Sequence, residues 1–206
     1  MKLLLIRHGE SEADILRVHE GRADFSLTER GHRQATAMAV YVASNYQIDR
    51  IYTSTLQRAA QTAQYLSDAT GMPIRPEHDL MEFNNGLLAG LPHKEAAVKY
   101  PRVLDLPPYK SIYGLESLVE FRDRAERVLT KILAEAADNE TIAVVTHGGT
   151  INQLYHAFLN LPVNDGMFFS TADTGIHEWI VEPTERRVAR SNYDTYTKET
   201  LKNYVT

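Results

Sequence analysis

The sequence predicts a layered α/β fold in which short buried strands alternate with amphipathic helices. Apolar, strand-like runs lie at Lys2–Arg7, Ile51–Thr53 and Thr141–Thr146, and each runs into a segment with helical spacing. No Gly/Ser-rich or Pro-rich linker and no internal repeat interrupts this alternation. Hydrophobic residues make up 43% of the 206 residues, which suffices for one core. We therefore expect a single domain over residues 1–206.

The first predicted strand, Lys2–Arg7, contains the apolar run Leu3–Ile6. Arg7 and His8 stop this run, so it is too short to form the core of a secretory signal. Because the sequence shows neither an export signal nor an apolar stretch long enough to span a bilayer, we expect a cytoplasmic protein with no membrane partner.

Helices are predicted where apolar side chains recur every three or four residues. The clearest covers Leu118–Ala137, in which Phe121 and Val128 share one face with further apolar residues. Ser117 and Glu120 have the spacing of a capping box at its start. The other predicted elements are helices at Thr28–Asn45, Thr55–Ala69 and Thr150–Leu159, and closing strands at Gly175–Val181 and Arg187–Arg190.

The segment Glu82–Tyr113 lacks a regular pattern and is interrupted by prolines such as Pro92 and Pro101. Only Pro92–Tyr100 can form a short helix. Irregular excursions of this length usually serve a function, most often as a lid over a site. We therefore predict a lid-like insertion at about residues 83–114.

Composition excludes several classes of protein. The net charge is −5 and the isoelectric point about 5.9, with acidic and basic residues interspersed, so no basic surface for nucleic acid is expected. The chain has no cysteine, which excludes a thiolate nucleophile, a disulfide and a cysteine zinc site. Apart from His8 and His147, the histidines lack metal-ligand spacing, and no metal site is predicted. They are His19, His32, His78, His93, His156 and His177.

Three polar clusters directly follow predicted strands, where ligands of α/β sheets usually bind. They are Arg7-His8-Gly9-Glu10, Ser54 through Arg58, and His147-Gly148-Gly149. A neutral histidine is a competent nucleophile, and the neighbouring arginine offers a fork of donors that matches phosphate oxygens. Gly9 lets the backbone approach a ligand closely.

These clusters form part of a longer series of motifs. In chain order they are Arg7-His8-Gly9-Glu10-Ser11, Gly31-His32-Arg33-Gln34-Ala35, Ser54-Thr55-Leu56-Gln57-Arg58-Ala59, Leu80-Met81-Glu82-Phe83, Gly114-Leu115-Glu116-Ser117 with Arg124, and Val144-Val145-Thr146-His147-Gly148-Gly149. The series resembles the histidine phosphatase superfamily, the phosphoglycerate mutase-like family, over most of the chain. The resemblance implies a three-layer α/β sandwich with a mostly parallel central sheet flanked by helices.

The resemblance also implies a phosphomonoester hydrolase that needs neither metal nor cofactor and acts on a small phosphorylated substrate. His8 would attack phosphorus and become phosphohistidine. The transferring group would be held by Arg7, Arg58 and His147. Glu82 would protonate the leaving oxygen and then take a proton from water. Further substrate-binding positions implied by the motifs are Gly9, Asp14, Gly21 and Gly148.

Two acidic residues depart from the family pattern. The family usually has Asn where this chain has Asp14, and an ionised Asp cannot donate a hydrogen bond to phosphate. Two unit charges about 4 Å apart repel by about 4 kcal/mol at an effective dielectric constant of about 20. Asp14 therefore turns away, is protonated in the complex, or weakens phosphate binding, and we expect weaker binding. Glu20 likewise replaces a residue that is usually neutral.

Two other functions compete with hydrolysis. The mutases of the family resemble Gly86–Leu91 but carry an adjacent pair of arginines downstream, where this chain has only Arg102. A mutase also shields its phosphohistidine from water with a lid and tail, and little chain follows the last predicted strands. A non-catalytic phosphate-binding module is the third alternative, although His8, Glu82 and His147 all persist. We favour hydrolysis; the physiological substrate and the oligomeric state stay open.

Overall fold

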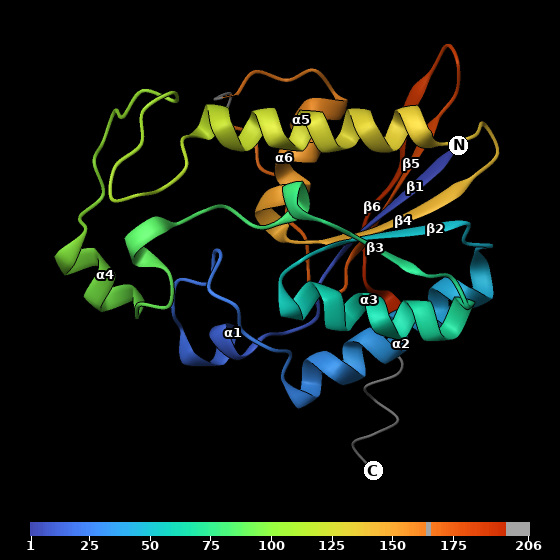
Figure 1. The fold of residues 1–206 in the computed structure, drawn as a ribbon, viewed down its shortest axis with the longest axis horizontal. Helices are drawn as coiled ribbons and strands as arrows, with labels where there is room; N and C mark the ends of the chain where they lie inside the picture. The colour runs from blue at the N-terminus through green and yellow to red at the C-terminus, as the bar shows by residue number, and fades with distance from the viewer. Residues whose placement is uncertain (164–165, 197–206) are drawn as a thin grey trace.

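The structure is a computed structural model and describes residues 1–163 and 166–196 (Figure 1). Its strands are β1 (Lys2–Arg7), β2 (Arg50–Ser54), β3 (Ile74–Glu77), β4 (Thr141–Thr146), β5 (Ile176–Val181) and β6 (Arg186–Tyr193). Its α-helices are α1 (Glu12–Leu16), α2 (Glu29–Asn45), α3 (Gln57–Thr70), α4 (His93–Lys99), α5 (Leu118–Glu135) and α6 (Gly148–Phe158). Two single 3₁₀ turns, η1 (His78–Leu80) and η2 (Gly86–Leu88), complete the described elements.

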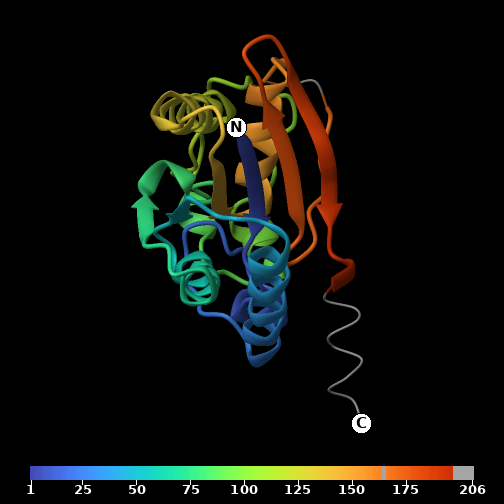
Figure 2. The ribbon, with the colours of Figure 1, turned by 90° about the vertical axis from the view of Figure 1, so that its right-hand side faces the viewer.

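The strands form one sheet in the order β3-β2-β4-β1-β5-β6. Neighbours from β3 to β1 run parallel, whereas β5 is antiparallel to β1 and β6 is antiparallel to β5. Figure 1 shows α5 and α6 on one side of the sheet and α2 and α3 on the other, and Figure 2 shows the β5–β6 hairpin at the edge opposite β3. The predicted mostly parallel α/β fold is confirmed.

Each face of the sheet has its own core because the strand side chains alternate between faces. In β1, Leu3 and Leu5 pack with apolar residues of α5 and α6, whereas Leu4 and Ile6 pack with those of α2 and α3. All four side chains are almost completely buried. A strand buried on both faces reads as a continuous apolar run, which explains the composition of Lys2–Arg7.

Besides the two 3₁₀ turns, the described residues contain one strand and one α-helix that the sequence analysis did not predict. β3 is an edge strand of four residues, Ile74–Glu77, and it contains Pro76, which an edge strand tolerates. The helix α1 has only five residues and leaves Ile15 and Leu16 exposed, so it has no apolar face that periodicity could reveal. Short length and local composition together hid both elements from the sequence analysis.

Predicted and observed boundaries agree closely elsewhere. The capping box of Ser117 and Glu120 is present at the start of α5, and the short helix predicted at Pro92–Tyr100 is α4. α3 starts two residues later than predicted, because Leu56 is still extended. Among residues 1–163 and 166–196, no helix is both long and apolar enough to cross a membrane.

Candidate active site

The three polar clusters meet at the carboxyl ends of the central strands, because they follow the neighbouring parallel strands β2, β4 and β1. His8 follows β1, His147 follows β4, and Arg58 lies in the first turn of α3 after β2. The two imidazole rings lie 5.0 Å apart between centroids. All three side chains are almost completely buried. Polar groups buried in this way require hydrogen-bond partners or a ligand.

The ring of His8 is fixed in one tautomer. Its Nδ1 lies 2.7 Å from the carbonyl oxygen of Gly9, which can only accept, so Nδ1 carries the proton. Nε2 is left with its lone pair and receives a hydrogen bond of 3.3 Å from Arg58 Nε. Burial, and then the charges of Arg7 and Arg58, hold the pKa of His8 well below its ordinary value. A neutral ring with an available Nε2 is the form that attacks phosphorus.

Glycines allow the backbone to approach closely around this ring. At Gly9, a Cβ atom would lie 2.6 Å from the carbonyl oxygen of Gly31, and the Gly9 N–H donates to Thr62 Oγ1. Gly21 has a φ of +48°, and a Cβ atom there would collide with the side chain of Asn85. The carbonyl oxygen of Gly21 accepts a 2.8 Å hydrogen bond from Arg58 Nη2 and so fixes the guanidinium group.

Two buried nitrogen atoms at the site have no partner among the described residues, namely Arg7 Nε and His147 Nδ1. His147 Nε2 lies 2.7 Å from Ser54 Oγ, which also accepts from the backbone N–H of Leu56. The Ser54 hydroxyl can therefore donate to Nε2, which leaves Nδ1–H as an unused donor. Burial is the main cause that lowers the pKa of His147, followed by the charge of Arg58. An unpaired buried donor is costly unless a ligand accepts from it.

Glu82 lies across from the N-terminus of α6. Its Oε2 accepts from the backbone N–H of Gly149 at 2.9 Å, and its Oε1 accepts from Phe83 N–H at 2.7 Å. These bonds fix a carboxylate beside the first residues of the helix. The Gly149 position has no room for a side chain, because a Cβ atom would lie 2.4 Å from Glu82 Oε1.

Arg124 of α5 holds the segment that carries Glu82. It donates to the carbonyl oxygens of Asp79, Met81 and Glu82. It also forms a bidentate pair with Glu116, at 3.0 Å and 2.7 Å. Arg124 is 5% exposed, so this pair is shielded from water. The sequence motif contained both Glu116 and Arg124, but nothing in the pattern indicated that they hold the backbone of Glu82.

Arg7, His8 and Glu82 line a central cavity of about 370 Å³. We use the name central cavity for the space lined by Arg7, His8, Glu20, Glu82, Gly148, Gly149, Phe168, Ser170 and Thr171. The last three residues come from the segment before β5 and were not predicted. Thr171 receives a hydrogen bond from Arg7 Nη1 on its carbonyl oxygen, and its hydroxyl group pairs with His177 Nε2.

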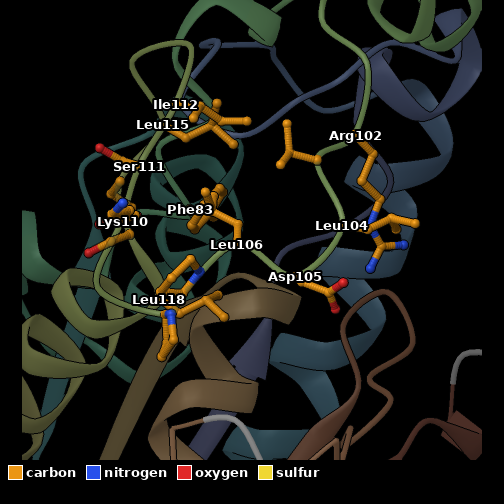
Figure 3. Close-up of a pocket in the computed structure, with 15 residues that line it drawn as sticks. Phe83, Arg102, Leu104, Asp105, Leu106, Lys110, Ser111, Ile112, Leu115 and Leu118 are labelled. Carbon is orange, nitrogen blue, oxygen red and sulfur yellow. The ribbon is translucent and has the colours of Figure 1, made fainter.

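A second cavity, which we call the outer cavity, has a volume of about 430 Å³ and begins at Phe83, next to Glu82 (Figure 3). Its walls come mainly from the predicted lid-like segment. Figure 3 shows apolar side chains such as Leu106 and Leu115 together with the cationic groups of Lys110 and Arg102. An organic group with an anionic edge is compatible with such a lining.

Asp14 does not line either cavity. Its Oδ2 accepts from Ser11 N–H at 2.9 Å and Ser11 Oγ at 3.2 Å, and it closes the capping box of α1. Of the three alternatives for Asp14, the structure thus has the carboxylate turned toward Ser11. Glu20, the other departure from the family pattern, lies inside the central cavity.

A neutral imidazole surrounded by arginine and histidine donors, opposite a carboxyl group, is the arrangement that phosphoryl transfer through a phosphohistidine requires. The sequence profile of the histidine phosphatase superfamily (branch 1) matches residues 3–194, and the chain belongs to this superfamily. The predicted family and phosphatase class are confirmed.

Relatives include both phosphatases and mutases. Phosphoserine phosphatase 1 of Hydrogenobacter thermophilus is 29% identical over 191 residues, which cover 91% of this chain and 89% of that protein. The 2,3-bisphosphoglycerate-dependent phosphoglycerate mutase of Brucella melitensis biotype 2 is 34% identical over 176 residues, covering 77% of this chain and 82% of the mutase. A solved structure of mycobacterial glucosyl-3-phosphoglycerate phosphatase with VO3 has a TM-score of 0.81 and 26% identity, and covers 93% of this chain and 98% of that one.

Proposed function

We propose that the protein hydrolyses small phosphomonoesters in two steps, with His8 as the nucleophile. In the first step, the His8 Nε2 lone pair forms a bond to phosphorus while the ester P–O bond breaks. Glu82 gives its proton to the leaving oxygen, and the alcohol departs. In the second step, water attacks phosphorus, Glu82 takes a proton from that water, and the P–N bond breaks. Inorganic phosphate then leaves the neutral imidazole behind.

The observation that carries this proposal is the set of nitrogen donors around a neutral His8. Arg7 Nε and His147 Nδ1 are buried without partners among the described residues, and phosphoryl oxygens would satisfy both. The charge that spreads over the phosphoryl oxygens in the transition state falls among Arg7, Arg58 and His147. Arg7 Nε and His147 Nδ1 are already in place as unpaired donors, so little reorganisation of these two groups is needed during the reaction.

The substrate's organic part fits the outer cavity. Phe83, the residue after the proposed proton donor, lines this cavity, and we infer that a leaving group protonated by Glu82 extends toward it (Figure 3). Apolar walls with Lys110 and Arg102 favour an alcohol that carries an apolar body and an anionic group. Most of this wall comes from residues 83–114, and the proposal that this segment acts as a lid over the substrate stays a prediction.

Trapping the intermediate tests the proposal. We expect the wild-type protein to acquire acid-labile, base-stable radiolabel from labelled phosphomonoester, and His8→Ala to acquire none. His93→Gln removes an exposed histidine and serves as the matched control, which should label normally. A wild-type protein that turns over substrate but never carries label on His8 contradicts the mechanism. A protein that binds phosphate without any turnover supports the non-catalytic module instead.

Mutase-type transfer is a second candidate, because a mutase relative shares 34% identity with the chain. The two functions differ in what removes the phosphoryl group from His8. We expect p-nitrophenyl phosphate to release inorganic phosphate in multiple turnovers without added bisphosphoglycerate. Phosphate release that stops after one turnover and resumes only when a phosphoglycerate acceptor is added favours the mutase.

A further inference from the structure

Glu20 places a carboxylate beside the proposed nucleophile. Its Oε2 lies 3.2 Å from Arg58 Nε and 3.8 Å from His8 Nε2. Its Oε1 accepts a hydrogen bond from Ser11 Oγ, and its side chain is 18% exposed. The carboxylate therefore forms part of the wall of the central cavity. The mechanism proposed above gives it no role.

The position of Glu20 conflicts with a phosphoryl dianion. Attack by His8 Nε2 requires phosphorus within about 3–3.5 Å of that nitrogen, so phosphoryl oxygens must lie at distances similar to that of Glu20 Oε2. The Arg58 guanidinium is already fixed, because Nη1 and Nη2 donate to the carbonyl oxygens of Ala23 and Gly21. Its Nε–H is the donor that His8 and Glu20 share. An ionised Glu20 thus occupies the place of a phosphoryl oxygen on Arg58.

We propose that Glu20 couples phosphate binding to the uptake of a proton, so that the occupied central cavity contains Glu20 in its neutral form. The inference rests on the proposed function, since it takes the cavity as the phosphoryl site. A neutral Glu20 no longer competes for Arg58, and its O–H can donate to a phosphoryl oxygen. Glu20 is therefore a specificity-determining residue, and it makes the site favour phosphate at low pH.

The surroundings of Glu20 are consistent with a readily protonated carboxyl group. Burial is the main influence and raises its pKa. Arg58 from α3, the hydrogen bond from Ser11 and Arg7 at the end of β1 lower the pKa, and Asp14 from α1 raises it. His8 faces it as a neutral ring. A phosphate dianion that enters the cavity adds negative charge and raises the pKa of Glu20 further. Binding then takes up a proton at pH values between the pKa of the free protein and that of the complex.

Calorimetric titration with inorganic phosphate tests the coupling. The titrations are made in buffers with different ionisation enthalpies, between about pH 5 and pH 8, because the buffer dependence of the heat counts the protons taken up. Glu20→Gln has the same shape but no charge to neutralise, and its amide oxygen can still accept from Ser11. Glu12→Gln removes a nearby exposed charge and is the matched control.

We expect the wild type and Glu12→Gln to take up more protons than Glu20→Gln at neutral pH. The ratio of the wild-type Kd to the Glu20→Gln Kd cancels the ionisation of phosphate itself. This ratio should rise by up to about tenfold per pH unit above the pKa of free Glu20. Equal proton uptake by both proteins, or a ratio that does not change with pH, overturns the inference. Glu20→Ala repeats the test if Glu20→Gln fails to fold.

The proposed function can fail independently of this inference. Proton uptake that depends on Glu20, in a protein that never forms phosphohistidine, supports the inference and contradicts the catalytic mechanism. Phosphohistidine formation together with identical proton uptake in the wild type and Glu20→Gln supports the catalytic mechanism and contradicts the inference about Glu20.

Discussion

Replacing Arg124 by lysine tests whether Arg124 positions the proposed proton donor. Lysine keeps a positive charge opposite Glu116 but loses the bidentate fork and most of the donors that reach three carbonyl oxygens. Hydrogen bonds to charged groups contribute about 1.5–3 kcal/mol each at most, and lysine retains part of them. We therefore expect Arg124→Lys to lower the free energy of unfolding by about 1–3 kcal/mol, leaving a folded protein.

The effect on catalysis should depend on the leaving group. A general acid contributes about 10²–10⁴ in rate, and a displacement of about 1 Å costs up to about 100-fold. We expect Arg124→Lys to lower kcat/KM about 10- to 100-fold for an alkyl phosphate, whose alkoxide must be protonated. For p-nitrophenyl phosphate the loss should be less than about threefold, because p-nitrophenolate leaves without a proton.

Measuring kcat/KM for the alkyl phosphate and for p-nitrophenyl phosphate tests this prediction, and Arg127→Lys is the matched control. Arg127 lies on the same helix but is exposed and pairs only with the side chain of Asp79 among the described residues. It should leave both rates unchanged, since an exposed pair contributes about 1 kcal/mol or less. Equal losses of activity on the two substrates in Arg124→Lys would refute the reasoning, because they would indicate a general structural defect.

Two further predictions concern pH and Asp14. Burial lowers the pKa of His177 to about 4. Below the ordinary histidine pKa of 6.5, the folded protein therefore binds fewer protons than the unfolded chain, and the free energy of unfolding decreases as the pH is lowered. Between pH 7 and pH 5, His177 alone should lower the free energy of unfolding, measured in urea, by about 2 kcal/mol, and His177→Gln should reduce this loss. An equal loss in the variant would show that His177 is not the group responsible. Asp14 lines neither cavity, but its charge acts on Glu20 and Arg58, so Asp14→Asn should tighten inhibition by phosphate only modestly. Unchanged inhibition together with an unchanged kcat/KM would show that Asp14 does not weaken binding.

The sequence was sufficient to predict the elements in which apolar residues recur in a clear pattern. The continuous apolar run of β1 and the apolar face of α5 result from burial, and burial leaves a pattern. The edge strand β3 and the helix α1 leave none, because Pro76 interrupts the first and exposed Ile15 and Leu16 obscure the second. Their structure depends on neighbours that are distant in the sequence.

The same limit applies to the candidate site. His8, Arg58 and His147 could be placed together because each follows a strand, and the carboxyl ends of parallel strands lie on the same side of a sheet. Thr171 could not be predicted, since the segment before β5 has no motif and reaches the cavity only through the antiparallel pairing of β5 with β1. The contact of Glu20 with Arg58 was also inaccessible, because it depends on how the chain turns at Gly21.

The central position of β1 determines when the surroundings of His8, the proposed nucleophile, can form during synthesis. The backbone N–H of His8 donates to Thr146, and its carbonyl oxygen accepts from Thr174 N–H. The second residue of the chain in turn pairs with Thr141 and Ile180. A nascent chain must therefore keep its first strand available until residues near 180 have left the ribosome. Such long-range pairing slows folding, and until it forms the apolar run of β1 stays exposed to aggregation.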